Sequence, residues 1–294
     1  MYLRMRPAVP LDVMMHKAAL TLIAGTVSLA ALGQTRTPDS LSIRVAELHA
    51  VLTHADTIMW DEAWDDSLPI NPVIEQRLLR VLAIPMADST LERVTKHHFL
   101  QHARSKDGRL WAFNWYENQG GTFHSFAHVF FYRTADGRGI AVGDGEGFCD
   151  SRAPFHKIHP LRSKTHPGLY LGMATVKGCT SCCGDVAVIF QLIGDSLNLT
   201  FPAFKDDERY LSNPSQEMPD IPCYLLGARC GDLLQWEFDE RKQRINYIFR
   251  VDDLSPIRLE DGENEGMVRG TLQFDGERFI EVMGKVEPDT YPQP

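Results

Sequence analysis

The stretch Leu110-Trp-Ala-Phe-Asn-Trp-Tyr-Glu117, joined through Asn118-Gln-Gly-Gly121 to the run Thr122 to Thr134, decides the fold class of this chain. Both runs are rich in aromatic and β-branched residues, and the Gly-Gly pair between them is a hairpin signal. Asp-Gly turns stand on either side, at Lys106-Asp-Gly108 and Ala135-Asp-Gly137. These alternating runs and turns predict an antiparallel meander.

Short β-rich runs continue toward the C-terminus. Polar and apolar residues alternate with period two in 232–239 and 244–251, which predicts strands with one wet face, and Asp275-Gly276 closes a last hairpin. The run Val186-Ala-Val-Ile-Phe190 is apolar on both sides and is predicted to lie centrally between covering layers. Residues 91–294 are thus predicted to form a mainly β domain, arranged as a barrel, a sandwich or an irregular propeller.

The segment 34–90, which precedes this domain, is predicted to contain two helices. A capping threonine and a proline begin the first, and Asn71-Pro72 gives the same signal for the second, which Pro85 stops. Apolar residues recur at helical spacing in both, at Leu41, Val45, Leu48, Leu52 and Ala55, and then at Ile74, Leu78 and Leu82.

Residues 1–33 have the pattern of a secretory signal peptide. An apolar, uncharged run from Ala18 to Leu32 follows Lys17 and ends at Gly33, ahead of a polar stretch. The apolar run is shorter than the roughly 20 residues of a membrane-spanning helix, so we expect cleavage and no integral span afterwards. The initiator is expected at Met14 or Met15. The protein is therefore predicted to be exported, to the periplasm or the extracellular space.

The charge balance is acidic. The net charge is -9, and removal of residues 1–33 brings it to -11. Nucleic acid and anionic membranes both need a basic footprint on the protein, and the sequence contains no local cluster of Lys and Arg. The sequence therefore argues against both classes of partner.

Six cysteines in an exported chain favour disulfides over metal ligation or thiol redox chemistry, although Cys179-Thr-Ser-Cys182 has the C-x-x-C spacing of both alternatives. Adjacent Cys182 and Cys183 strain the bridge geometry if bonded to each other, and a Cys223–Cys230 bridge would close a small loop. The pairing stays open among 15 connectivities. The disulfide candidates are Cys149, Cys179, Cys182, Cys183, Cys223 and Cys230.

The aromatic strands also offer candidate ligand contacts. Core packing is the preferred interpretation of the strand from 110 to 117; the alternative is that one face is exposed and its rings, with neighbouring polar groups, form a stacking platform for sugars or peptides. Two imidazoles four residues apart on a strand are about 13 Å apart and cannot share one metal ion. The candidate contacts are Trp111, Trp115, Tyr116, Glu117, His124 and His128.

The glycine-rich loop from Gly143 to Asp150 gathers Asp144, Glu146 and Asp150, which are possible calcium ligands or ordinary turn residues. Turn chemistry is the preferred interpretation. The sequence lacks the G-x-S-x-G, H-E-x-x-H, P-loop and S-x-x-K signatures. We therefore predict no metal, no cofactor and no identifiable catalytic residue.

The stretch from Asn114 to Tyr132, with its Gly-Gly-Thr turn and its second aromatic strand, resembles a family of uncharacterised bacterial exported proteins. The resemblance covers mainly residues 90–135 and, more loosely, Gly270 to Val282. It implies no activity, cofactor or site residue.

The leading hypothesis is an exported, non-catalytic binding or structural module with an aromatic-rich β surface and a possible glycan or peptide ligand. The alternative is an exported glycan or peptide hydrolase that uses residues such as Glu117, Asp144, Glu146, His124 or His128.

Overall fold

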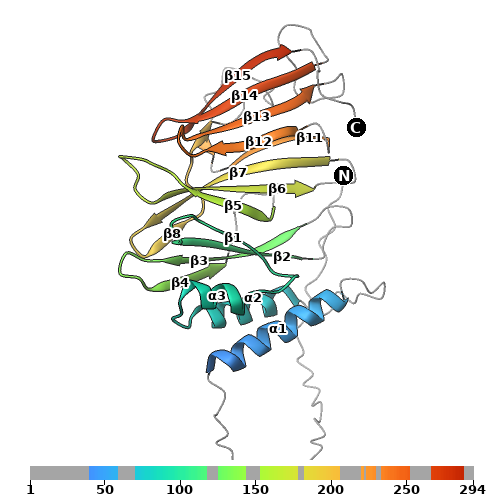
Figure 1. Cartoon of the computed structure of the whole chain (residues 1–294), viewed down its shortest axis with the longest axis vertical. Helices are drawn as coiled ribbons and strands as arrows, with labels where there is room; N and C mark the ends of the chain where they lie inside the picture. Colours follow the sequence, from blue (N-terminus) through green and yellow to red (C-terminus); the bar gives the residue numbers. More distant parts are fainter. Residues whose placement is uncertain are drawn as a thin grey trace, which may run out of the picture. The chain divides into compact units, whose positions relative to one another are not determined.

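The computed structural model of the protein describes residues 40–58, 70–117, 125–143, 153–177, 182–205, 220–221, 223–229, 233–251 and 266–287. The described residues form three helices, followed along the chain by fifteen strands in three sheets (Figure 1). The fold is therefore mainly β with helices at its N-terminal side, as the sequence predicts. No helix in the described part of the chain is long and apolar enough to cross a membrane.

The helical segment contains α1 (Ser40–Ile58), α2 (Ile70–Leu82) and α3 (Asp88–Val94). The first two confirm the predicted helices, since the residues that recur at helical spacing, such as Leu48 and Leu78, are fully buried. The third was not predicted from the sequence. It has only seven residues, so its helical periodicity is limited to the buried pair Leu91 and Val94.

The first sheet contains β1 (Gln101–Arg104), β2 (Leu110–Tyr116), β3 (Phe126–Arg133) and β4 (Gly139–Gly143), in that order and antiparallel. The predicted meander is thus confirmed. Its tight turns depend on two glycines in the left-handed region, Gly108 at a φ of 71° and Gly137 at 84°. A side chain at either position would strain the backbone.

The second sheet has the order β11-β7-β6-β5, with β8 paired to β7. Its strands are β5 (Phe155–Pro160), β6 (Leu169–Lys177), β7 (Cys182–Ile193), β8 (Ser196–Asn198) and β11 (Cys223–Arg229). The third sheet has the order β10-β9-β15-β14-β13-β12, and only β9 and β15 pair in parallel among its described strands. Its strands are β9 (Phe204–Lys205), β10 (Asp220–Ile221), β12 (Leu233–Asp239), β13 (Arg244–Val251), β14 (Gly266–Phe274) and β15 (Phe279–Glu287).

Three hydrophobic cores order these elements into layers. One core packs the helices against the face of the first sheet that carries Trp111, Phe113 and Trp115. The opposite face of the first sheet packs on the second sheet, and the far face of the second sheet packs on the third. The layers therefore follow one another as helices, first sheet, second sheet and third sheet (Figure 1), a sandwich extended to three sheets.

The centre of this arrangement is β7. Ala187 and Ile189 belong to the core shared with the third sheet, whereas Val186, Val188 and Phe190 belong to the core shared with the first. All five are at most 1% exposed. The predicted central strand, apolar on both faces, is confirmed because neighbouring sheets cover both of its faces.

The cysteines that the structure describes lie in the second sheet, where Cys182 and Cys183 belong to β7 and Cys223 begins β11. In the backbone register Arg229 lies opposite Cys182, and Ala228 opposite Cys183. Cys149, Cys179 and Cys230 lie outside the described residues.

Candidate functional site

The tryptophans proposed as ligand contacts are core residues. Trp111 is fully buried and Trp115 is 1% exposed, both between the first sheet and the helices. The indole N–H of Trp115 donates to the Asn71 side chain of α2 at 3.1 Å. The helical layer therefore covers this face of β2, so core packing is confirmed for these two residues and the alternative, a stacking platform, is wrong for them.

The other predicted contacts have partners inside the fold. His128 is 1% exposed and its Nε2 donates to the Ala153 carbonyl at 2.9 Å. The Glu117 carboxylate accepts a hydrogen bond from the Ser125 hydroxyl, and the half-buried Tyr116 ring lies 5.7 Å from that of Phe126. The remaining candidates, His124, Asp144, Glu146 and Asp150, lie outside the described residues.

Three hairpin turns, one from each sheet, lie side by side and bring a different set of residues together. We call residues 105–109, 161–168 and 240–243 the three-turn patch; they join β1 to β2, β5 to β6 and β12 to β13. Local hydrogen bonds shape two of the turns. Asp107 Oδ1 accepts from the Ser105 hydroxyl at 2.6 Å and from the Arg109 N–H at 3.1 Å. Asp239 likewise accepts from two backbone N–H groups of the third turn.

Glu240 joins the turns to one another. Its Oε2 accepts from Lys106 Nζ at 2.9 Å, and its Oε1 lies 3.2 Å from Nδ1 of His159. Arg162 donates to the backbone carbonyls of Glu240 at 3.1 Å and Arg241 at 2.6 Å. All three sheets thus contribute to one hydrogen-bonded network at this end of the strands.

Two further bonds fix the second turn against its neighbours. The Arg162 N–H donates to Gln243 Oε1 at 2.8 Å, and the Tyr170 hydroxyl donates to Asp107 Oδ2 at 2.8 Å. Burial, together with the Asp107 carboxylate, raises the pKa of Tyr170 far above its usual range, so the hydroxyl keeps its proton. These contacts hold the backbone of the patch in one arrangement.

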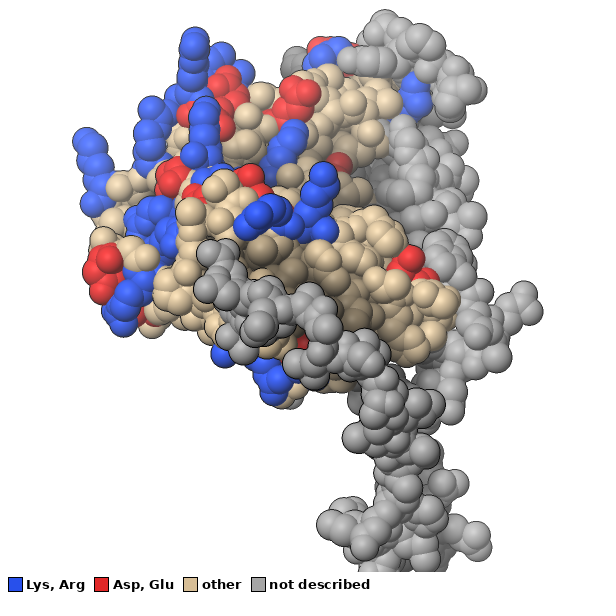
Figure 2. Space-filling model, turned by 60° about the horizontal axis from the view of Figure 1, so that its bottom comes forward, with Lys and Arg blue, Asp and Glu red and all other residues tan. Residues whose placement is uncertain are grey.

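The patch is rich in cations. It contains two acidic residues, Asp107 and Glu240, against six basic ones: Lys106, Arg109, Arg162, Lys164, Arg241 and Lys242. Of these six, only Arg109 is half-buried and the others are exposed. Figure 2 shows lysines and arginines gathered on the left, the side on which the hairpin turns lie in Figure 1. An acidic chain therefore carries a locally basic surface.

The acid and base groups in the patch are already engaged. The hydrogen bonds from Lys106 and His159 lower the pKa of Glu240, so that it is ionised at neutral pH. Burial lowers the pKa of His159 more than Glu240 raises it. The Nε2 atom of His159 is buried and makes no hydrogen bond within the described part of the chain. The imidazole of His159 is therefore not placed to exchange a proton with a molecule in solvent, whereas the Glu240 side chain is 40% exposed and bonded to Lys106 and His159.

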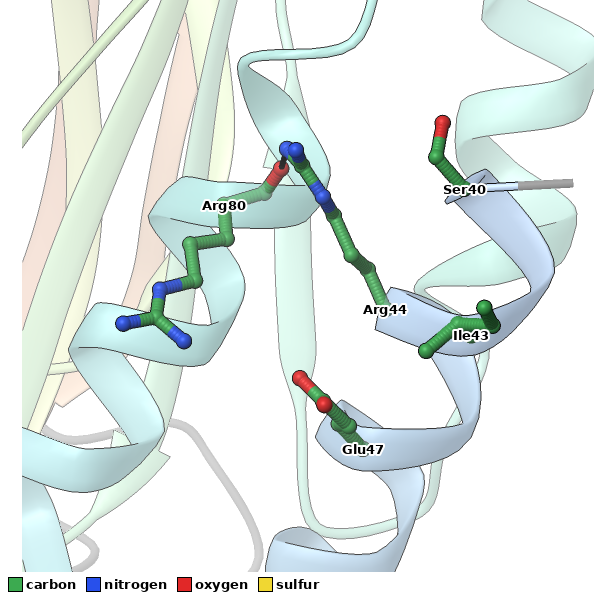
Figure 3. Close-up of a pocket in the computed structure, with 5 residues that line it drawn as sticks. All are labelled: Ser40, Ile43, Arg44, Glu47 and Arg80. Carbon is green, nitrogen blue, oxygen red and sulfur yellow. Dashed lines mark hydrogen bonds between the residues drawn. The ribbon is translucent and has the colours of Figure 1, made fainter.

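A groove of about 370 Å³ lies between α1 and α2 (Figure 3). It is lined by Ser40, Ile43, Arg44, Glu47 and Arg80. Arg44 Nη1 donates to the Arg80 carbonyl at 2.8 Å, and Glu47 pairs with Arg77 at 2.5 Å. Two of its polar side chains therefore hold the helices together.

Histidines gather where α1 meets the segment after α3. The His97 ring stacks on His98 at 4.5 Å and meets His49 edge-on at 5.6 Å, while His98 Nε2 lies 2.8 Å from Asp56 Oδ2. Burial, His98 and His49 lower the pKa of His97, whereas Asp56 raises it. Within the described ranges, no group of three or more His, Cys, Asp or Glu residues is arranged to hold a metal ion.

Sequence reasoning missed both the histidine cluster and the three-turn patch. Lys106 and Glu240 are 134 residues apart, so no sequence window contains the patch. Sequence reasoning also passed over Arg241, Lys242 and Arg244, which lie within four residues, and the fold adds cations from two other turns to them. Counting charges in the turns would have revealed the excess of cations.

The fold and the site together define a protein of stacked β-sheets with a basic surface at the hairpin turns. No protein-family model matches the chain, and the comparisons with curated proteins and with solved structures find no match either. The argument about function therefore rests on the arrangement of residues in the three-turn patch.

Proposed function

We propose that the protein is an exported, non-catalytic binding module and that the three-turn patch is its ligand-binding surface. The observation that carries this proposal is the junction at Glu240, where turns of three different sheets are bonded together. A surface fixed before the ligand arrives loses little conformational entropy on binding. Export itself is proposed from the signal-peptide pattern of residues 1–33.

The state of the titratable groups favours binding over catalysis. A general acid must hold a proton near neutral pH and reach the substrate, but the lowered pKa of Glu240 leaves it ionised. A general base must expose a free nitrogen or oxygen, but Nδ1 of His159 faces Glu240 and its Nε2 is buried. These groups act as structural ties, while the cations around them face solvent.

The test is a comparison on a glycan and peptide array. Purified mature protein is compared with a variant carrying Lys164→Gln, Arg241→Gln and Lys242→Gln. The structure gives no side-chain hydrogen bond or ion pair for these three residues, so the variant is expected to fold normally. We expect the wild-type protein to bind at least one glycan or peptide on the array and to leave its mass unchanged. We expect the variant not to bind that ligand. Equal retention by both, or recovery of a cleaved ligand, contradicts the proposal.

A further inference from the structure

We infer that the ligand of the three-turn patch is an anionic polysaccharide, a chain of sugars that carries carboxylate or sulfate groups. This inference rests on the proposed function and names its ligand class. Six cations on three adjoining turns supply the positive field, in a chain whose net charge is -9. Exposed arginine and lysine side chains pair well with carboxylate and sulfate oxygens.

The patch also offers groups that recognise hydroxyls. Ser163 Oγ lies 3.3 Å from Thr165 Oγ1 and accepts the His166 N–H at 2.9 Å, which orders a pair of hydroxyls in the exposed second turn. The carboxylates of Asp107 and Glu240 lie among the cations and accept hydrogen bonds. Sugars present hydroxyl donors together with acidic groups, so a surface of mixed sign matches them. A phosphate backbone presents acceptors and no comparable donors, so it cannot donate hydrogen bonds to these carboxylates.

The apolar content of the patch points away from nucleic acid and membranes. The large exposed hydrophobic residues of the described chain are Ile43, Val73, Ile193, Ile280 and Val282, and none belongs to the patch. A membrane-binding surface buries apolar side chains between its cations. Single-stranded nucleic acid stacks its bases on exposed aromatic rings, whereas the ring of Tyr170 beneath the patch is 2% exposed.

The acidic remainder of the molecule adds a second argument. A membrane plane or a DNA duplex is an extended anionic surface, which brings charges beyond the patch within the screening length of about 8 to 10 Å. A flexible polysaccharide contacts the patch alone and avoids this repulsion. The small size of the patch therefore fits a single sugar chain better than an anionic surface.

The experiment measures binding by isothermal titration calorimetry at low and high NaCl. The probes are polygalacturonate, dextran sulfate, neutral dextran, a 20-base-pair DNA duplex and phosphatidylglycerol vesicles. We expect an acidic polysaccharide to bind and neutral dextran not to bind, with affinity falling as salt rises. The variant Lys164→Gln/Arg241→Gln/Lys242→Gln should weaken binding about tenfold or more, since each exposed pair contributes modestly.

A matched control removes three exposed cations outside the patch, by Arg80→Gln, Arg93→Gln and Lys96→Gln. Among the described residues, these three side chains also have no hydrogen bond or ion pair, so this variant is expected to fold normally. Both triple variants remove three positive charges, so a nonspecific charge effect would weaken polysaccharide binding equally in the two. That result would overturn the inference, as would tighter binding of DNA or of vesicles. If no polysaccharide probe binds but the array ligand still depends on the patch, the inference fails and the proposed function stands. If polygalacturonate binds and gains reducing ends, the non-catalytic proposal fails instead.

Discussion

Strand β2 and the three-turn patch are neighbours in the chain, because residues 105–109 lead directly into Leu110. They differ in what surrounds them. The first six residues of β2 are buried, and two of its polar side chains are bonded to adjacent layers, Trp115 to Asn71 and Asn114 to Phe155. The patch is bonded through backbone carbonyls and a few carboxylates, while Lys164, Arg241 and Lys242 are exposed and make no side-chain hydrogen bond or ion pair to any described residue. Stability and recognition are therefore carried by different residues, and each can be changed with little effect on the other.

The largest effect on stability is expected from Trp115→Ala. The indole is buried between the first sheet and the helices, so its removal leaves a cavity and takes the donor from Asn71 Oδ1. Such changes cost about 3–5 kcal/mol. Urea denaturation should show this loss, with a smaller one for Trp115→Phe. A change below about 1 kcal/mol would mean that the helices do not cover this face as described.

A smaller loss is expected for Asn114→Ala on the opposite face of β2. The Asn114 side chain is fully buried and bonded to β5, where it donates to the Phe155 carbonyl at 3.0 Å and accepts the Phe155 N–H at 3.1 Å. Leaving two buried backbone groups unsatisfied costs about 2–3 kcal/mol. The exposed pair Gln235 and Glu237 provides the control, since Gln235→Ala should change stability by less than about 0.5 kcal/mol. Equal effects of the two variants would contradict the role of Asn114 as a tie between sheets.

Acidification should loosen the attachment of α1. The pKa of His97 is lowered in the folded protein by burial and by His98 and His49, with Asp56 opposing. The unfolded chain therefore binds more protons, so the free energy of unfolding falls as the pH drops below about 6.5 and through the folded pKa. Thermal melts between pH 7.5 and 5 measure this pH dependence of stability. The dependence should shrink in His97→Gln, and an unchanged slope in that variant would exclude His97 as its source.

The smallest effect on stability is expected from the patch variant Lys164→Gln/Arg241→Gln/Lys242→Gln. The side chains removed are exposed and make no contact that holds the turns, so the free energy of unfolding should change by less than about 0.5 kcal/mol. Its binding to the ligand should nevertheless weaken about tenfold or more. The opposite is expected for Trp115→Ala, which should lose stability but keep its binding at temperatures where it stays folded. If the patch variant unfolds easily, the separation of stability from recognition is wrong.

Much of the secondary structure could be predicted, because local signals determine it. The Asp-Gly turns at Gly108, Gly137 and Gly276 all have the positive φ that such turns need. Strand β5 was missed, since its residues His156, Lys157 and His159 interrupt the apolar alternation. Beside its ladder with β6, this strand makes one isolated bridge, between Ile158 and Ser105, and its side chains at His156 and Lys157 are exposed, so it does not need the apolar composition of β7.

The candidate site could not be predicted, because it depends on which sheets stack. The aromatic side chains of β2 fit a core face and a ligand platform equally well until the position of the helices is known. Likewise, nothing near Lys106 in the sequence announces Glu240. Their contact exists only because β12 and β13 place their turn beside the turn between β1 and β2.

The order of strands in the second and third sheets has a consequence for biogenesis. After β7 and β8 the chain enters the third sheet with β9 and β10, returns to the second with β11, and goes back to the third with β12. The second sheet is complete only when β11 has been synthesised and the third only when β15 has, and such interleaved long-range pairing folds slowly. If the chain is exported as proposed, this delay is useful, since a translocation channel that accepts only unfolded chains would then meet a chain whose core has not yet closed.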